Sequence, residues 1–498
     1  MRKRIVCTAI VVGLALAPVV SFADDVQDQQ QQMQALQDRM SSLEDQLGAA
    51  NDVVSRQQEI IDRSGIADDQ SASSGVAAFF DSLEMGGWLA GSYNYNFNDP
   101  NGEILGGSNQ GATGFAHPFH GDSNSFQVDQ LWMEMERPVT ESQRAGFRAD
   151  FVYGKTAEVL NKPGSSSNQS GSFEQYNLYQ AYIQYLAPVG EGVTLKFGKM
   201  ATPIGAEVAP TVYNWNVTRG NVYNLLQPIN WVGISAEAEL GEGFSLLLGY
   251  GNENVADLDV DLNRNKAVIG SLGWSGETVG VTLSGTWGST NGALLATNGG
   301  VYAPPCTPLA STGQCTQGSL ESDKEIIGDL VVTWDPTADL SLWVDGTWRR
   351  VDLNDAGSFA GSTAKSFFRG SQVSAWGVAA AGRYAVNDRM GVAVRAEYLD
   401  DQDSFFTGLA VPGAFTTAGS LAPAGDSTKL YSLTGTVDYS LTEQLVVRGE
   451  VRYDLADIDT GNSGLPAGYS RDEVFIGSKA GKLEDDQLTA GVEVIYNF

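Results

Sequence analysis

The chain has 498 residues, enough for two or three ordinary domains. Its 60 Asp and Glu outnumber its 30 Lys and Arg, and the resulting net charge of -30 rules against nucleic acid as a partner. The 58 glycines and an aromatic share of 10% favour an all-β protein over a helical one.

Residues 1–23 have the pattern of a secretory signal peptide. Arg2, Lys3 and Arg4 precede an apolar stretch over residues 5–20, and small residues lead to Ala23. The apolar stretch is shorter than the roughly 20 residues that a membrane-spanning helix needs. We therefore expect export and cleavage after about Ala23, with an uncleaved anchor as the alternative.

Residues 24–64 predict a periplasmic coiled coil. Apolar residues recur every seventh position, and a second series fills the intervening seam position. The two series are Val26, Met33, Met40, Leu47, Val54 and Ile61, and Leu36, Leu43 and Ala50. So narrow a stripe favours helix-to-helix association, and the alternative is a solvated helix lying against the barrel or envelope. Residues 65–83 then form a linker, beginning with Gly65 as a helix C-cap.

From residue 84 the apolar period changes from seven to two. In residues 444–455, for example, Val447, Val451 and Tyr453 alternate with Arg448 and Arg452. Long alternating segments with aromatic ends are typical of transmembrane barrels, with lipid outside and a polar lumen inside. We predict sixteen antiparallel strands near 84–97, 125–137, 144–155, 176–187, 192–200, 230–240, 243–252, 265–274, 278–288, 324–334, 339–352, 372–385, 389–400, 428–440, 444–455 and 486–498.

The connections between these segments alternate strictly between short and long. Short turns such as 240–243, 335–338 and 386–388 belong on the periplasmic side of an outer-membrane barrel, and long loops outside. Both termini then lie in the periplasm. A soluble β-sandwich, the alternative all-β fold, has no reason to sort its connections in this way. The sequence thus predicts an outer-membrane barrel over residues 84–498.

The last segment alternates to the final residue. Gly491, Val494, Tyr496 and Phe498 match the C-terminal signal by which outer-membrane proteins reach the barrel-assembly machinery. This machinery is therefore a predicted partner, together with outer-membrane lipid and lipopolysaccharide.

Two cysteines remain after removal of the signal peptide, because Cys7 lies within it. Cys306 and Cys315 lie in a Pro-, Ser- and Gly-rich stretch of an exported chain, so we expect one disulfide within a loop. We expect no metal site there, because no histidine is near.

A sixteen-stranded barrel is wide enough for an aqueous channel. The third long connection, residues 201–229, is the candidate for a segment folded into the lumen, by analogy with general porins. An ordinary surface loop is the alternative. If residues 201–229 fold into the lumen, the candidate residues of the constriction are Glu207, Tyr213, Trp215, Arg219 and Tyr223.

Charged residues at inward-facing positions are further pore-lining candidates. They are Arg148, Asp150, Arg349, Arg383, Arg395, Arg448 and Arg452. Such arginines could create a transverse field or bind carboxylates in a bidentate manner, or they could pair across strands and brace the wall. Both interpretations stay open.

Several short motifs resemble a known family. Residues 91–97, 124–126 and 146–150, and the pair 198–199 followed by Pro203, Gly205 and Glu207, resemble the putative β-barrel porin-2 (OmpL-like) family. The likeness covers about residues 84–250 and is weaker towards the C-terminus. The coiled-coil prefix is similar to those of DcaP-like dicarboxylate porins and LbtU-type siderophore porins. The resemblance implies a bacterial outer-membrane porin and provides no set of binding residues.

The expected function is passive diffusion of small hydrophilic solutes, with anions such as carboxylates as one class. A homotrimer, formed through barrel and coiled coil, is the expected assembly. The alternatives are a structural or adhesive protein with a plugged lumen and a siderophore-type uptake channel. We expect no enzyme, cofactor or metal, since His117 and His120 are the only histidines and flank Pro118 and Phe119.

Overall fold

The computed structural model describes residues 79–80, 82–99, 117–120, 124–161, 175–252, 266–290, 323–352, 358–359, 362–363, 372–404, 406–407, 427–459, 475–476 and 483–498. The chain divides into two units, residues 1–82 and 83–498. Within the first unit only Phe79, Phe80 and Ser82 are described. The predicted signal peptide and coiled coil therefore lie outside the described residues, as do Cys306 and Cys315.

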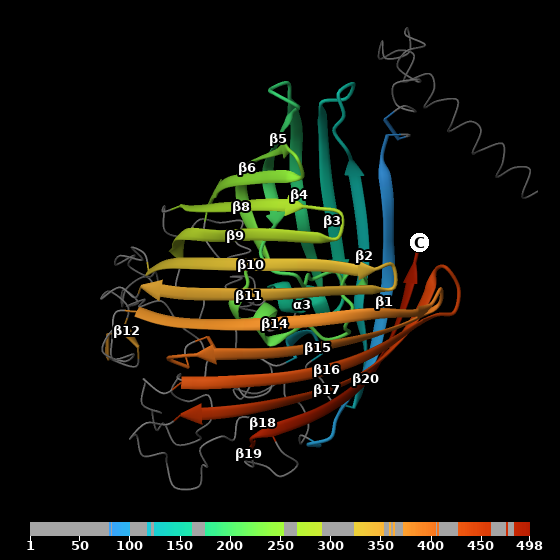
Figure 1. Cartoon of the computed structure of the whole chain (residues 1–498), viewed down its shortest axis with the longest axis vertical. Coiled ribbons are helices and arrows are strands. Elements are labelled where there is room, and N and C mark those ends of the chain that lie inside the picture. Colours follow the sequence, from blue (N-terminus) through green and yellow to red (C-terminus); the bar gives the residue numbers. More distant parts are fainter. Residues whose placement is uncertain are drawn as a thin grey trace, which may run out of the picture. The chain divides into compact units, whose positions relative to one another are not determined.

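Sixteen strands of the described residues close into one antiparallel barrel (Figure 1), as predicted. Strand β20 pairs with both β17 and β1, which completes the closure. The barrel strands are β1 (Glu84–Asn96), β2 (Ser125–Arg137), β3 (Ala145–Tyr153), β4 (Tyr176–Ala187), β5 (Val193–Ala201), β6 (Asn230–Gly241), β7 (Phe244–Gly251), β8 (Ala267–Ser275), β9 (Val279–Thr290), β10 (Asp323–Thr337), β11 (Leu340–Asp352), β14 (Gln372–Asn387), β15 (Met390–Asp401), β16 (Ser427–Ser440), β17 (Leu445–Asp459) and β20 (Asp486–Asn497).

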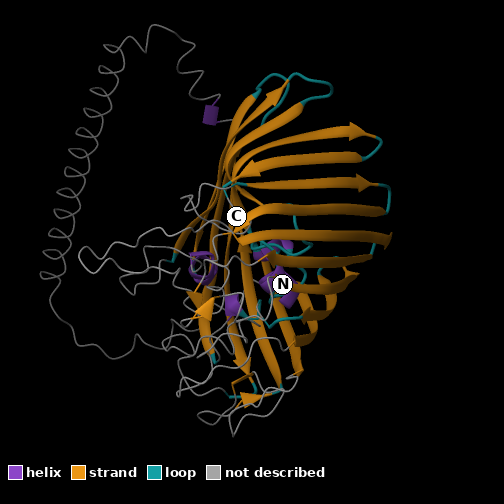
Figure 2. Cartoon of the chain, turned by 90° about the vertical axis from the view of Figure 1, so that its left-hand side faces the viewer, coloured by secondary structure: helices purple, strands orange, loops and turns teal. Residues whose placement is uncertain are grey.

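The long connections contain shorter elements. Two small hairpins are formed by β12 (Ser358–Phe359) with β13 (Ser362–Thr363), and by β18 (Phe475–Ile476) with β19 (Leu483–Glu484). The helical elements are η1 (Pro118–His120), α3 (Lys155–Asn161), η3 (Thr211–Tyr213) and α4 (Asn221–Leu226). Helix α3 contacts β2 and β4, and α4 contacts β11, β14 and β15, so both lie against the inner wall (Figure 2).

Side chains alternate between the two faces of the wall because successive residues of a strand point to opposite sides. On β17, Val451 and Tyr453 are 54% and 40% exposed on the outer face, whereas Arg452 and Asp454 are 0% and 1% exposed on the inner face. An apolar outside and a charged inside match the predicted membrane barrel.

Aromatic residues form a ladder on the outer face near the long loops. The rings of Trp376 and Tyr398 are 5.2 Å apart between centroids, and those of Tyr398 and Tyr431 are 5.1 Å apart. Trp376 and Tyr431 are exposed at the outer surface, and Tyr398 between them is partly exposed. Such girdles lie at the membrane interface of outer-membrane barrels.

The two ends of the barrel differ in their connections. Short turns at one end join β2 to β3, β4 to β5, β6 to β7, β8 to β9, β10 to β11, β14 to β15 and β16 to β17. Long connections join the strands at the other end. We call these the turn end and the loop end. Their alternation confirms the predicted sorting of short and long connections. No helix within the described residues is long and apolar enough to cross a membrane.

Strand β3 ends at Tyr153, two residues before the predicted end of that strand. Gly154 has a φ of 118°, a conformation that side chains rarely adopt, and a β-carbon there would lie 2.7 Å from the Val128 carbonyl oxygen. The backbone turns at this glycine into α3.

Candidate functional site

Residues 202–229, which we call the inner loop, connect β5 to β6 and lie inside the barrel. Val217 and Leu226 are completely buried in it, although the loop belongs to no barrel strand. Its polar groups are bonded to inward-facing side chains of the wall, because buried backbone donors and acceptors need partners. The structure therefore places the predicted third loop in the lumen.

The first contact region is the wall formed by β10 and β11. Backbone N–H groups of Gly205 and Ala206 donate to Asp329 Oδ1 at 3.1 Å and to Asp345 Oδ2 at 2.8 Å. Arg349 Nη1 donates to the Leu225 carbonyl at 2.9 Å, while its Nε pairs with Glu325 at 2.6 Å. Both ends of the inner loop are thus attached to the same part of the wall.

The second contact region is on β15. Arg395 Nη1 donates to Glu207 Oε1 at 2.5 Å and to the Thr218 carbonyl at 2.6 Å. Arg395 Nε also lies 3.3 Å from Glu397 Oε2. Gly220 donates to Glu207 Oε2 at 2.8 Å, and a β-carbon at Gly220 would collide with Glu397. This close packing of loop backbone on a buried ion pair requires glycine.

The third contact region is on β17. Glu450 accepts hydrogen bonds from the N–H groups of Val217 and Thr218 at 2.6 and 3.0 Å. Arg452 donates to the Arg219 carbonyl at 2.8 Å and to Asn221 Oδ1 at 2.9 Å. An acid and a base of one strand therefore bind adjacent residues of the loop.

The fourth contact region lies where β20, β1 and β2 meet. Thr211 Oγ1 donates to Glu493 Oε1 at 2.8 Å, and Arg448 donates to the Thr211 carbonyl at 3.1 Å. Gln130 accepts from the Thr211 N–H at 3.0 Å and donates to the Ala209 carbonyl at 2.7 Å. The inner loop is thereby held on several sides of the barrel.

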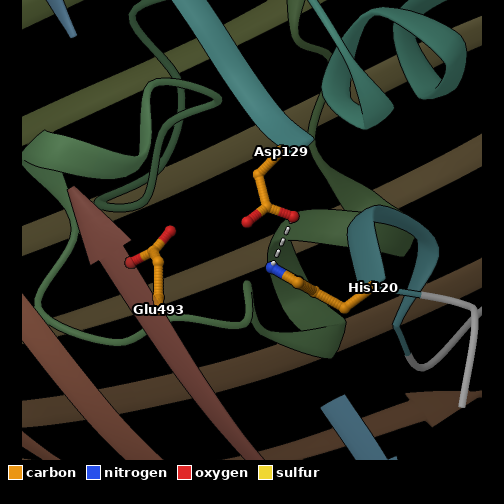
Figure 3. Close-up of side chains that lie close together, drawn as sticks. All are labelled: His120, Asp129 and Glu493. Atoms are coloured by element: carbon orange, nitrogen blue, oxygen red, sulfur yellow. Dashed lines mark ion pairs between the residues drawn. The ribbon is translucent and has the colours of Figure 1, made fainter. Parts of the chain in front are cut away.

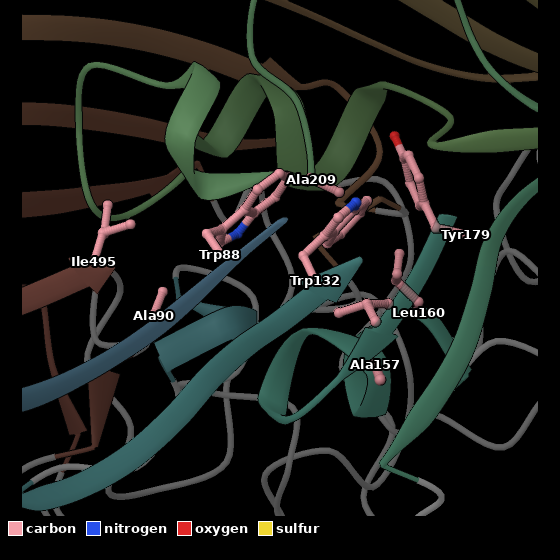
Figure 4. Packing of buried hydrophobic residues seen from close by; sticks show 9 residues of the cluster. Trp88, Ala90, Trp132, Ala157, Leu160, Tyr179, Ala209 and Ile495 are labelled. Atoms are coloured by element: carbon pink, nitrogen blue, oxygen red, sulfur yellow. The ribbon is translucent and has the colours of Figure 1, made fainter. Parts of the chain in front are cut away.

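An apolar cluster fills the lumen beside β1 to β4 (Figure 4). The indoles of Trp88 and Trp132 stack with ring centroids 5.2 Å apart, and both are buried. Ala157 and Leu160 of α3 and Ala209 of the inner loop pack into the same cluster. The second long connection therefore also folds inwards, which the sequence analysis did not predict.

The described part of the first long connection lies in the lumen as well. His117 Nε2 lies 2.9 Å from Asp454 Oδ2, and Phe119 stacks under Arg219, whose Cζ is 4.9 Å from the ring centroid. Burial, reinforced by the nearby Arg452 charge, lowers the pKa of His117. Burial and Arg219 hold the pKa of His120 well below its usual range. Both histidines are therefore neutral near pH 7.

Burial also shifts the ionisation of inner-loop groups. Loss of water raises the pKa of Glu207, and the Arg395 charge opposes this shift. Tyr223 is fully enclosed, and burial raises its pKa.

Most of the candidate charges meet around the inner loop. Glu207, Arg219, Arg349, Arg395, Arg448 and Arg452 are each at most 8% exposed. Tyr223 is buried with them, while Trp215 lies apart, with its ring centroid 6.2 Å from that of Trp343.

Three candidates face the turn end instead. Arg148 pairs with Asp150 at 2.9 Å and with Glu134 and Glu136 at 3.1 Å each, and its side chain is 23% exposed. Arg383, 32% exposed, pairs with Asp438 at 2.8 Å. Tyr213 is 61% exposed and reaches towards Glu134. These residues are separate from the buried network.

Sequence reasoning missed several residues that hold the inner loop. Gln130, Asp329 and Gln227 are buried and bind loop or wall, and Trp88 and Trp132 form the lumen cluster. For the residues on strands, Gln130, Asp329, Trp88 and Trp132, the inward parity of their positions was the available signal. It indicates the face of the wall but not the partner.

Comparison with solved structures finds similar barrels at low identity. The trimer form of OmpT of Vibrio cholerae shares 11% identity with a TM-score of 0.47, over 84% of this chain and 99% of that one. The outer membrane channel DcaP of Acinetobacter baumannii shares 10% identity with a TM-score of 0.47, over 84% and 97%. OmpF of Salmonella typhi, in complex with daunomycin, shares 9% with a TM-score of 0.43, over 84% and 97%. Similarity at this level does not transfer function.

No curated protein matches the chain. The family model described as "Putative beta-barrel porin-2, OmpL-like" matches residues 82–498, which include every strand of the barrel. The predicted resemblance is confirmed, and this chain belongs to the OmpL-like β-barrel porin-2 family of the outer membrane.

Proposed function

We propose that this outer-membrane porin lets small hydrophilic solutes diffuse passively past the inner loop. The observation that carries the proposal is the uneven attachment of that loop. Its hydrogen bonds reach β2, β10, β11, β15 to β17 and β20 through residues such as Gln130, Asp345 and Glu450. No described residue of the inner loop is hydrogen-bonded to β7, β8 or β9, nor to β3 or β4. Because the apolar cluster fills the lumen beside β1 to β4, the solute path is assigned to the side of β7 to β9.

Part of the inner face of β7 to β9 supports this assignment because its side chains are small, whereas Leu247 and Ile269 on the same face pack with Trp231. Inward positions carry Ser245, Gly249, Ser271, Gly273, Gly280 and Thr282, all of them partly exposed. Gly273 faces Ser245, and Gly280 faces Thr333, which places these small residues on one surface. A wall of small polar residues opposite a fixed loop leaves room for water and solutes.

A solute that has passed the inner loop would then meet charged residues at the turn end of the barrel. Lys196 pairs with Glu237 at 2.8 Å, and their side chains are 20% and 29% exposed. Arg148 and Arg383 are partly exposed too, unlike the arginines bound to the inner loop. A preference for carboxylates would therefore rest on these two arginines.

Paired tryptophan substitutions test the proposed path. Ser271→Trp adds an indole to the inner face of β8, whereas Leu272→Trp adds the same group to the lipid face, where Leu272 is 45% exposed. Swelling of proteoliposomes in small sugars should be slowed several-fold by Ser271→Trp and unchanged by Leu272→Trp. Equal swelling rates for the two variants would place the path elsewhere.

The segments packed inside the lumen favour a second candidate function, that of a structural or adhesive protein. Segments of three long connections, represented by Phe119, α3 and the inner loop, are packed inside the barrel. A structural or adhesive protein with a plugged lumen would have this arrangement. Wild-type proteoliposomes that do not swell at all would favour it over the porin.

We also propose a homotrimer with a periplasmic coiled coil. The heptad pattern of residues 24–64 supports self-association. The mass of the detergent-solubilised protein, measured by light scattering, tests the trimer.

A further inference from the structure

Three side chains from different parts of the chain converge near the inner loop without using their full bonding capacity. His120 comes from η1, Asp129 from β2 and Glu493 from β20 (Figure 3). One ligand atom from each lies within 4.8 Å of the other two. The three residues are 6%, 3% and 0% exposed. We call them the His–Asp–Glu cluster.

Two atoms of the cluster are buried without a hydrogen-bond partner among the described residues. They are His120 Nε2 and Asp129 Oδ2. His120 Nε2 lies 3.6 Å from Asp129 Oδ1, which is too long for a hydrogen bond. Leaving such groups unpaired costs about 1–3 kcal/mol each. Both atoms are therefore free to bind a ligand.

The separation of one atom pair, His120 Nε2 and Asp129 Oδ1, fits two ligands of one metal ion better than a direct hydrogen bond. Ligand bonds of about 2.0–2.2 Å in a tetrahedral site place two ligand atoms roughly 3.4 Å apart. The separation of 3.6 Å between His120 Nε2 and Asp129 Oδ1 is close to this edge length. In Figure 3 the imidazole points at the Asp129 carboxylate, and the Glu493 carboxylate faces the same space.

Neighbouring groups orient the carboxylates by hydrogen bonds, as residues behind the ligands do in metal sites. Asp129 Oδ1 accepts hydrogen bonds from Ser92 Oγ at 3.0 Å and from Gln127 Nε2. Glu493 Oε1 accepts from Thr211 Oγ1 at 2.8 Å. Gln127 also donates to the Phe119 carbonyl at 2.9 Å, next to His120. The ligands are thus held by the wall, the inner loop and the first long connection.

We propose that His120, Asp129 and Glu493 bind a divalent transition-metal ion. One imidazole nitrogen with two carboxylates suits Zn²⁺ better than Ca²⁺ or Mg²⁺, which prefer oxygen ligands alone. Arg448 lies 3.4 Å from Glu493 Oε2, and the charge of Arg219 acts on all three residues, so a bound ion competes with these two arginines for the carboxylates. The bound ion links the first long connection to β2 and β20 and holds it inside the lumen.

Zinc binding by the full-length protein in detergent micelles tests the site directly. Chelator-treated protein, titrated with Zn²⁺ by calorimetry, should bind one ion per chain. His120→Gln should weaken that affinity by about tenfold or more. His117→Gln is the matched control, because His117 is equally buried but pairs with Asp454 outside the cluster. Absence of binding by the folded wild type, or equal loss in both variants, would overturn the proposal.

A spectroscopic measurement on the wild type needs no variant. X-ray absorption of the zinc-loaded protein should show nitrogen and oxygen ligands, including one imidazole. Sulfur ligation would place the ion on the cysteines instead and would refute the assignment.

Discussion

At the scale of single residues, most arginines on the inner face of the barrel are buried and bind the inner loop, so they are not exposed to the lumen. Arg395 is completely buried and joins Glu207, Glu397 and the Thr218 carbonyl. Breaking such a buried pair leaves uncompensated charge, at a cost of about 3–5 kcal/mol. An exposed pair of the same type contributes about 0–1 kcal/mol.

The first prediction compares these two situations. Arg395→Met should lower the free energy of unfolding by about 3–5 kcal/mol, because Glu207 and Glu397 lose their partner. The control is Arg350→Met, since the Arg350 side chain is 34% exposed in its pair with Asp352. Guanidinium unfolding in micelles measures both. Equal stability of the two variants would show that the Arg395 network does not hold the fold.

The inward position of these arginines could be predicted from the sequence, but their partners could not. Arg452 and Asp454 alternate with Val451 and Tyr453, and this local period fixes the face of the wall. The bond between Thr211 and Glu493 joins residues 282 positions apart. A contact of that separation leaves no periodic signal in a single sequence.

At the scale of elements, the strands and the inward fold of the third long connection were predicted, whereas the inward fold of the first and second long connections was not. Strand β2 has the predicted bounds, because alternation and turn residues are local properties. Helix α3 has only 7 residues, which is too short to show a helical period, and it is stabilised by packing with Trp132 and Tyr179. Segments of this kind depend on the closed barrel around them.

The second prediction concerns the hold of the wall on the inner loop. Gly220→Ala would push a methyl group against Glu397 and Glu207, so the loop should detach locally. Current noise of single channels should rise, and protease sensitivity within residues 202–229 should increase. Gly435→Ala is the control, because nothing lies within 4 Å of its β-carbon position. An unchanged Gly220→Ala channel would contradict a tightly clamped loop.

At the scale of the whole molecule, the barrel and the coiled coil predicted for residues 24–64, which we call the N-terminal arm, can be tested separately. The barrel is closed by β20 pairing with β1, and Phe498 exchanges backbone hydrogen bonds with Gly87 at 2.9 and 3.0 Å. The heptads of residues 24–64 lie outside the described residues, so the arm stays a prediction.

The third prediction separates barrel from arm. Deletion of residues 24–64 should leave the single-channel conductance unchanged, because the path lies in the barrel. It should lower the thermal stability of the trimer, since one set of subunit contacts is removed. Light scattering during heating measures the assembly. A deletion variant that dissociates no earlier than the full chain would refute a role of the arm in trimer formation.

The central claim is that a water-filled path passes the inner loop, and single-channel recording in planar bilayers tests it most directly. The full-length protein should give discrete, ohmic openings with a reversal potential in a salt gradient, and Ser271→Trp should reduce the unitary conductance while Leu272→Trp does not. Reconstituted, folded protein that gives no ion-permeable openings would contradict the porin and support a plugged barrel.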